Sequence, residues 1–305
     1  MRLMKRDELL QNTRQLLTKT GFYCSEICRM RPISFDFIAR KDSTLLLVKV
    51  LSNIDALSEE VARELISIAR FLEGAPIVIG HRTCSTTLED DVVYFRYGVP
   101  IITHATLENY MRGVMPFIIA APGGFYVNID GELLRETRLA KGISVGHLAR
   151  VAGVSRRTIR MYETGERASI EMAEKIAAFI GDDFIKPIAF WEEIAEEEAE
   201  MKRVENDLLK LIEEMCTVIL PTERSPFNAL SQILHEKFLV GINERRIVEK
   251  AHLISNLASV AEKESVIFME QFNRTNIEGV PVIVKREMRK ITGPEEFIDL
   301  VEERK

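Results

Sequence analysis

The sequence predicts two α/β regions that flank a central all-α region. Three observations indicate this division of the 305 residues. Residues 1–128 alternate between short apolar strands and amphipathic helices, as an α/β (α+β) sandwich does. Residues 129–181 show four short helical patterns separated by turns that contain glycine. Residues 217–305 return to strands and helices, after an acidic stretch at 182–216 that has the pattern of a linking helix.

Composition and charge limit the class of protein. Hydrophobic residues make up 46% of the chain, which allows sizeable cores. No run of eighteen apolar residues occurs, and the N-terminal residues MRLMKRDELL lack the apolar core of a signal peptide. Four cysteines do not make a disulfide framework in a chain of this length. We therefore expect a cytoplasmic protein without a membrane segment.

The central region begins with a helix that has Leu133 and Leu134 on its apolar side. Its exposed side is expected to carry Glu132, Arg135 and Arg138. Gly142 should end this helix, because glycine readily adopts the left-handed conformation at a helix end. Ser144 can cap a second helix through its hydroxyl group. The buried side of that helix is expected to hold Leu148, Ala149 and Ala152.

A third helix follows the tight turn at residues 152–155, where Gly153 is free to take a positive φ. Ser155 can cap this helix. Ile159 and Tyr162 should face inward, which leaves three arginines facing outward: Arg156, Arg157 and Arg160. A fourth helix should run from about 169 to 180. Two short helices joined by a turn, the second rich in outward arginine, make a helix-turn-helix.

The segment 131–180 resembles the helix-turn-helix domain of the Cro/lambda-repressor type. The residues that carry the resemblance are Leu134, Arg138, Leu148-Ala149, Gly153-Val154-Ser155, Ile159 and Tyr162-Glu163-x-Gly165. This family often has Gln at the start of the second helix, where it contacts a phosphate. Here Ser144-Val145 occupies that place, so the contact would come from the hydroxyl group or the backbone. The resemblance implies binding to double-stranded DNA.

The start of the third helix would then enter the major groove. Arginine can bond in a bidentate way to guanine, and serine or threonine can bond to bases or phosphates. The predicted DNA-binding residues are Ser144, Ser155, Arg156, Arg157, Thr158, Arg160 and Arg167. Residues 131–180 hold nine Lys or Arg against six Asp or Glu, a local charge of +3 in a chain of −6. A basic island in an acidic protein indicates a polyanionic partner, although the same arginines could form a solvated helix face.

The first α/β region places Asp36 on one predicted strand and Lys49 on the next. This pattern resembles the restriction-endonuclease-like fold, whose metal-dependent nucleases carry an Asp and then Glu-x-Lys on adjacent strands. Here Leu47 occupies the place of the Glu, and leucine cannot bind a metal. We therefore predict the fold without its activity. A metal-dependent nuclease targeted by the helix-turn-helix is the alternative.

No other metal or cofactor site is predicted. Two pairs of possible zinc ligands are present, Cys24 with Cys28 and His81 with Cys84, but neither pair has the spacing of a zinc ribbon. The chain contains no GxxxxGK[ST] phosphate loop and no arrangement typical of a catalytic nucleophile. We therefore expect no enzyme activity and no cofactor.

The acidic stretch contains apolar residues at seven-residue intervals: Ile194, Met201, Leu208 and Met215. This spacing fits a dimerising coiled coil, and it also fits a long helix that lies on its own domain. A homodimer is expected in either case, because helix-turn-helix proteins of this type usually read two half-sites one helical turn apart.

The last region weakly repeats the first. Residues 35–38 align with 227–230, residues 46–48 with 238–240, and residues 98–102 with 279–283. Asn228 takes the place of Asp36 in this alignment, and Gly241 takes the place of Lys49. An internal duplication is therefore predicted, in which the second copy lacks every nuclease candidate.

The whole arrangement resembles a family of archaeal HTH-type transcriptional regulators in which a Cro-type domain lies between two such α/β regions. The resemblance implies a sequence-specific regulator that reads the major groove with residues 155–162. An architectural or antitoxin-like interaction protein is a further alternative. The sequence indicates no particular small-molecule effector.

Overall fold

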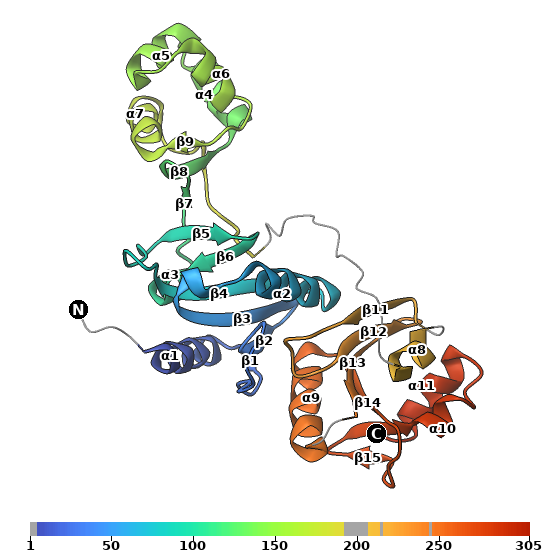
Figure 1. Ribbon diagram of the computed structural model, residues 1–305. Coiled ribbons are helices and arrows are strands. Elements are labelled where there is room, and N and C mark those ends of the chain that lie inside the picture. The colour runs from blue at the N-terminus through green and yellow to red at the C-terminus, as the bar shows by residue number, and fades with distance from the viewer. Residues whose placement is uncertain (1–4, 192–206, 214–215, 244–245) are drawn as a thin grey trace. The chain divides into compact units, whose positions relative to one another are not determined.

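The computed structural model describes residues 5–191, 207–213, 216–243 and 246–305. These residues form two compact units, whose elements are labelled in Figure 1. The first unit holds residues 5, 51–56 and 78–191, and the second holds residues 6–50, 57–77 and the described residues from 207 onward. None of the helices described is both long and apolar enough to cross a lipid bilayer.

The second unit begins with helices and strands from the N-terminal region. They are α1 (Arg6–Lys19), β1 (Tyr23–Cys24), β2 (Phe37–Lys41), β3 (Thr44–Asn53, as far as Val50) and α2 (Glu59–Phe71). β2 pairs with β1 on one side and with β3 on the other, and both pairings are antiparallel. Every residue of β3 from Leu45 to Val50 is buried, which explains its nearly continuous apolar sequence. Ser58 begins α2 by accepting a hydrogen bond from the Val61 backbone amide.

The C-terminal part of the second unit forms a sheet of its own. Its elements are α8 (Asp207–Glu213), β11 (Val218–Pro221), β12 (Ala229–Ile233), β13 (Glu236–Ile242), α9 (Ile247–Ala261), β14 (Glu264–Met269), β15 (Asn276–Ile277), β16 (Val280–Val284), α10 (Lys285–Met288) and α11 (Pro294–Glu302). The rings of Phe238, Phe268 and Phe297 meet in its core. Leu208 of α8 is buried in the same core. The heptad positions Ile194, Met201 and Met215 lie outside the described residues.

The two sheets share their strand order and several hydrogen bonds. The larger sheet begins β1-β2-β3-β4-β6-β5 and continues to β7, β8 and β10, and the smaller sheet has the matching order β11-β12-β13-β14-β16-β15. The Asp36 amide donates to Val48 O over 2.7 Å, and the Asn228 amide donates to Val240 O over 2.7 Å. The Asp36 side chain accepts from the Val50 amide, and the Asn228 side chain accepts from the Ile242 amide. The positions that the sequence alignment pairs therefore have equivalent surroundings.

Within the second unit, the N-terminal part donates hydrogen bonds to the C-terminal end of a helix in the C-terminal part, and the C-terminal part does the same in return. Arg40, at the end of β2, donates hydrogen bonds to the Val260 and Ala261 carbonyls of α9, over 2.9 and 2.7 Å. Lys237, at the start of β13, donates to the Phe71 carbonyl of α2 over 2.8 Å. Cations at helix C-termini satisfy free carbonyls and complement the helix dipole. Each part thus caps a helix of the other.

The first unit combines strands with the helices α3 to α7. Its elements are η1 (Ile54–Ala56), β4 (Ala75–Arg82, from Val78 on), β5 (Val92–Arg96), β6 (Val99–Ile102), α3 (His104–Met111), β7 (Ile118–Ala121), β8 (Gly124–Ile129), α4 (Gly131–Ala140), α5 (Val145–Ala152), α6 (Arg156–Tyr162), β9 (Ala168–Ser169), α7 (Ile170–Ile180) and β10 (Ile185–Lys186). β7 and β8 form an antiparallel hairpin.

Strand β8 is connected to both ends of the segment that contains α4, α5, α6 and α7, which we call the helical part. The chain leaves β8 directly into α4, and β9 and β10 both return to pair with β8. Tyr126 of β8 lies opposite Ser169, and Ile129 lies opposite Ile185. The four helices are therefore fixed to the sheet at their beginning and at their end, as Figure 1 shows in green and yellow.

Candidate nucleic-acid interface

Short polar side chains set the boundaries of the helices, as the sequence predicts for two of them. Ser144 begins α5, and its hydroxyl group accepts a hydrogen bond from the His147 amide over 3.1 Å. Ser155 begins α6 in the same way, with the Thr158 amide as donor over 3.1 Å. Gly153 ends α5 with a φ of 73°, in the left-handed region that favours glycine. These residues fix the turn between α5 and α6.

The helices enclose a small apolar core. Its buried members include Leu134, Leu148, Ala149, Ala152, Ile159, Tyr162, Ala173 and Ile176. The sequence assigns the inward positions of α5 and α6 correctly. Asp130 begins α4 by accepting from the Leu133 amide over 3.1 Å, and this hydrogen bond lowers the pKa of its carboxyl group. Asp130 is thus a helix-capping residue that the sequence pattern did not predict.

Arg138 is buried beside this core, although the sequence pattern predicts it on the exposed side of the helix. Its Nε atom is 2.5 Å from Glu163 Oε1, and its Nη1 atom donates to Ile143 O over 2.9 Å. The side chains of Arg138 and Glu163 are only 7% and 10% exposed. Arg138 therefore ties the end of α4 to the residues before α5 and after α6. Its position four residues after the buried Leu134, on the same helix face, was a signal for this burial.

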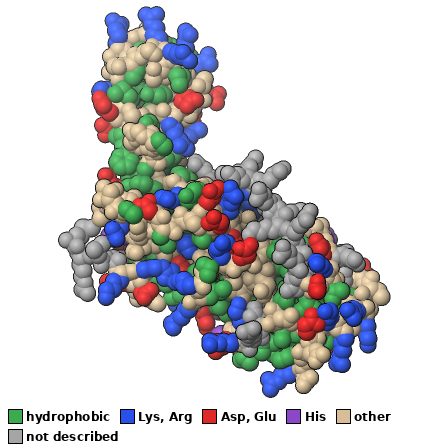
Figure 2. Space-filling model, viewed as in Figure 1, with side chains coloured by type: hydrophobic (Ala, Val, Ile, Leu, Met, Phe, Trp, Pro, Cys, Tyr) green, Lys and Arg blue, Asp and Glu red, His purple; other side chains and the backbone are tan. Residues whose placement is uncertain are grey.

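The outward face of the helix-turn-helix is basic. Arg156, Arg157 and Arg160 of α6 are exposed, as is Arg150 of α5. None of these four forms an ion pair with a residue that the structure describes. Figure 2 shows Lys and Arg side chains gathered at the end of the helical part that lies away from β7 and β8. Because the pair Arg138–Glu163 is internally neutral, the exposed arginines leave this end positively charged.

The arginines of the predicted site differ in their surroundings. Arg156 lies against α5, since a Cβ atom on Gly146 would come 2.9 Å from Arg156 Nε. The hollow between α5 and α6 has a volume of about 400 Å³ and includes Ser144 and Arg156 in its lining. Arg167 is farther along the chain, and its Nε atom donates to Asn128 Oδ1 on β8 over 3.0 Å. Most of the predicted DNA-binding residues therefore lie at or within α5 and α6: Ser144, Ser155, Arg156, Arg157, Thr158 and Arg160. Arg167 lies beyond α6 and is hydrogen-bonded to β8.

Comparison with known proteins decides the family. Residues 134–181 match the model of the helix-turn-helix family, and residues 6–116 match that of the PD-(D/E)XK superfamily domain. A protein of Methanococcoides burtonii is 40% identical over 316 residues, which cover 99% of this chain and 98% of that protein. A protein of Archaeoglobus fulgidus is 34% identical, with 97% of each chain covered. Both are named "Putative HTH-type transcriptional regulatory protein".

The chain belongs to this family of HTH-type transcriptional regulators. A third relative, from Methanosarcina acetivorans, is 37% identical over 99% of the chain and carries the same name. No solved structure matches the regulator. Its family and its helix-turn-helix domain make the regulator a DNA-binding protein, with double-stranded DNA as its partner.

Asp36 lies in the segment that matches the PD-(D/E)XK superfamily domain, and it is fully buried. Asp36 Oδ1 accepts a hydrogen bond from Arg6 over 2.5 Å, and Oδ2 accepts one from the Val50 amide over 2.7 Å. Leu47, at the place of the metal-binding Glu, is buried and offers no oxygen ligand. These residues do not fit the divalent ion of a PD-(D/E)XK nuclease.

Lys49 of the regulator is buried beside Asp36. Its Nζ atom donates to Ile33 O over 2.7 Å, and burial lowers the pKa of Lys49 to about 8. Among the residues described, no cluster of three His, Cys, Asp or Glu side chains could hold a metal ion. The lysine is thus engaged with the backbone rather than directed toward an open site.

Proposed function

We propose that the regulator is a sequence-specific DNA-binding protein that acts as a dimer and reads the major groove with α6. The carrying observation is the exposure of Arg156, Arg157 and Arg160 on a short helix that Ser155 caps. A helix of this kind fits the major groove, where guanidinium groups can distinguish guanine from the other bases. Ser144, Thr158 and Arg167 would position the domain through phosphates.

The proposal of a dimer follows from the size of α6. A helix of seven residues can contact only a few base pairs. Two copies that read half-sites one helical turn apart would double the number of base contacts and require a two-fold symmetric operator. We propose that this dimer acts on DNA in the cytoplasm.

We further propose that the N-terminal and C-terminal α/β regions are copies of one domain and that neither cleaves DNA. The shared strand order and the equivalent hydrogen bonds of Asp36 and Asn228 support a duplication. The carboxylate of Asp36 is already bound to Arg6 and to a backbone amide, which argues against metal binding. The PD-(D/E)XK domain would then act as a scaffold for the DNA-binding domain.

Selection of bound duplexes from a random pool, at a stated salt concentration, tests this function. We expect an enriched site with two-fold symmetry and half-sites about 34 Å apart. An enriched site without symmetry would contradict the dimer. Salt-sensitive binding without an enriched sequence would contradict sequence-specific reading and favour an architectural role.

Substitutions in α6 then test the groove assignment on the selected duplex. Arg156→Ala and Arg160→Ala should each weaken binding by about 1–3 kcal/mol if the residue contacts a base, with relaxed specificity at one position. Lys175→Ala on α7 is the matched control, because it removes the same charge from a side chain already paired with Glu171. If both arginine variants bind like wild type, α6 is not the reading helix.

The nuclease alternative has a separate test. Supercoiled plasmid carrying the selected site is incubated with the regulator and Mg²⁺ or Mn²⁺. We expect no nicking. Divalent-dependent nicking that disappears in Asp36→Ala would overturn the proposal of a non-catalytic domain.

A further inference from the structure

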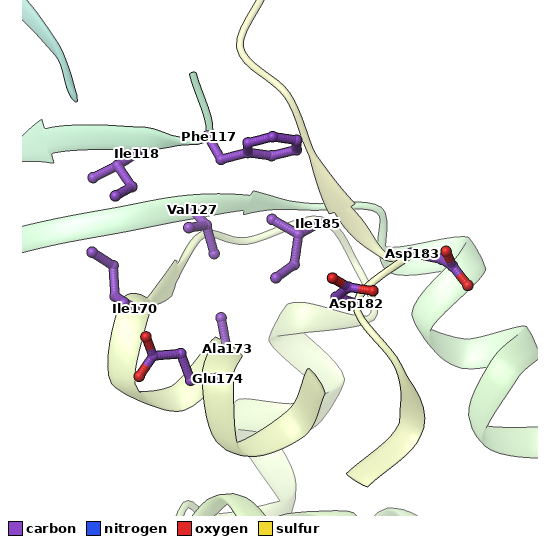
Figure 3. Close-up of a pocket in the computed structure, with 9 residues that line it drawn as sticks. All are labelled: Phe117, Ile118, Val127, Ile170, Ala173, Glu174, Asp182, Asp183 and Ile185. Carbon is purple, nitrogen blue, oxygen red and sulfur yellow. The ribbon is translucent and has the colours of Figure 1, made fainter. Parts of the chain in front are cut away.

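An apolar pocket lies beneath α7, the last helix of the helix-turn-helix domain. Its volume is about 420 Å³, within the range of small-molecule sites. Its apolar lining comes from β7, β8, α7, β10 and the residue before β7: Phe117, Ile118, Val127, Ile170, Ala173 and Ile185. Figure 3 shows these side chains directed toward a common space. Phe117 is 43% exposed, so an apolar ligand could cover part of its ring.

The polar part of the pocket is acidic. Among the described residues that line it, Glu174, Asp182 and Asp183 are charged and none is basic. Within the part of the chain that the structure describes, none of the three forms an ion pair. In Figure 3, Glu174 and Asp182 flank the apolar side chains from α7 and from the residues before β10, and Asp183 lies farther out. The pocket therefore combines an apolar body with two unpaired acidic groups at its margins.

An apolar lining with acidic groups at its margin favours a ligand that has an apolar body and a positive charge. An anion would meet uncompensated negative charge, and a neutral apolar molecule would use only the apolar part of the pocket. A cation with an aliphatic body would satisfy both parts, because its ammonium group can donate charge-assisted hydrogen bonds to carboxylates. An aliphatic amine matches these requirements, and a diamine could reach both acidic groups.

The pocket is continuous with the core of the DNA-binding domain. Val127 and Ala173 belong to the buried core that also contains Leu148 of α5 and Ile159 of α6. α7 presents Ala173 to this core, and its next residue, Glu174, lines the pocket. A ligand that binds one position of α7 better than another would shift the population of the arrangement that supports α5 and α6.

We propose that this pocket binds a small aliphatic amine and that the bound amine changes the affinity of the regulator for DNA. The first statement depends only on the pocket. The second rests on the proposed DNA-reading function, because α7 acts on DNA through α5 and α6.

Calorimetric titration of the full chain with hexylamine and cadaverine tests the first statement without any DNA. We expect saturable binding of at least one amine, and much weaker binding of hexanol and hexanoate. The double variant Glu174→Gln/Asp182→Asn should bind the amine at least about tenfold more weakly, since it loses the charge-assisted contacts. Both side chains are exposed, so the variant keeps the folded core.

Glu171→Gln is the matched control, because Glu171 lies one turn earlier on α7 and pairs with Lys175 outside the pocket. This variant should bind the amine like wild type. The amine site is overturned if neither amine saturates, if hexanol binds as tightly as hexylamine, or if the double variant binds like wild type.

The second statement is tested with the selected duplex and hexylamine. The amine should shift the DNA affinity of wild type and leave that of the double variant unchanged, which also corrects for any binding of the amine to DNA itself. An equal shift in both proteins, or no shift in either, would overturn regulation. Failure of the regulator to bind any duplex would refute the proposed function alone, because the titration without DNA would still report on the pocket.

Discussion

Substitution of Arg138 should lower the folding stability of the DNA-binding domain more than substitution of any surface arginine. In the variant Arg138→Met, Glu163 would keep its buried carboxylate without its cationic partner. The Ile143 carbonyl would also lose a hydrogen-bond donor. Methionine approximates the length of the arginine stem, so the change mainly removes charge and hydrogen bonds rather than packing.

The expected cost follows from the burial of the pair. With side-chain exposures of 7% and 10%, both groups are shielded from solvent. Breaking a buried ion pair by removing one partner costs about 3–5 kcal/mol, because an uncompensated charge stays in the interior. Replacing both partners, as in Arg138→Met/Glu163→Leu, removes that charge. We expect the double variant to recover all but about 1–2 kcal/mol, the remainder reflecting the unpaired Ile143 carbonyl.

Native-state hydrogen exchange, read on peptides from α5 and α6, is the suitable assay. It reports the opening of this domain separately from the opening of the rest of the chain. This separation is needed because a chain with several domains is not expected to unfold in a single two-state transition. DNA affinity on the selected duplex gives a second readout and should fall in the single variant. A buried ion pair of this strength is contradicted if Arg138→Met lowers the opening free energy by less than about 1 kcal/mol. It is also contradicted if the double variant is no more stable than the single one.

Two further predictions concern the second unit. Burial lowers the pKa of Lys49 from 10.5 to about 8, so at about 1.4 kcal/mol per pKa unit its charged form costs roughly 3 kcal/mol. Lys49→Met should therefore stabilise the second unit by about 1–2 kcal/mol at pH 7, after loss of the hydrogen bond to Ile33, measured on the urea transition in which that unit unfolds. This gain should shrink between pH 8 and 10.5, where the unfolded state binds more protons than the folded state. The hydrogen bond to Glu26, reinforced by its charge and by Glu278, raises the pKa of His252. Its stabilising contribution should be complete below pH 6.5 and lost as pH rises through the raised pKa, and thermal unfolding of His252→Gln should lack this dependence.

Local signals in the sequence predict the helices of the DNA-binding domain well. Ser144, Gly153 and Ser155 act through atoms within three or four residues along the chain, so their roles are readable from spacing alone. Arg138 shows the limit of this reasoning. Its helical position indicates burial, its charge indicates exposure, and only the nearness of Glu163, which is 25 residues away, decides between them.

The pocket beneath α7 is harder to predict from sequence. Phe117 and Ile185 both line it although they are far apart in the sequence. They come near only because β8 pairs with β7 on one side and with β10 on the other. The apolar pattern of each strand predicts burial, and the space left between the strands and α7 depends on non-local packing that no single segment specifies.

The reciprocal helix caps in the second unit affect how this protein can change in evolution. In a symmetric homodimer, every substitution at the interface occurs twice, so both sides must tolerate it together. Here the corresponding contacts join two parts of one chain, and each side can vary alone. The result is visible in the caps themselves, since an arginine covers α9 while a lysine covers α2. Such a contact also persists at any dilution, because its partners share one polypeptide.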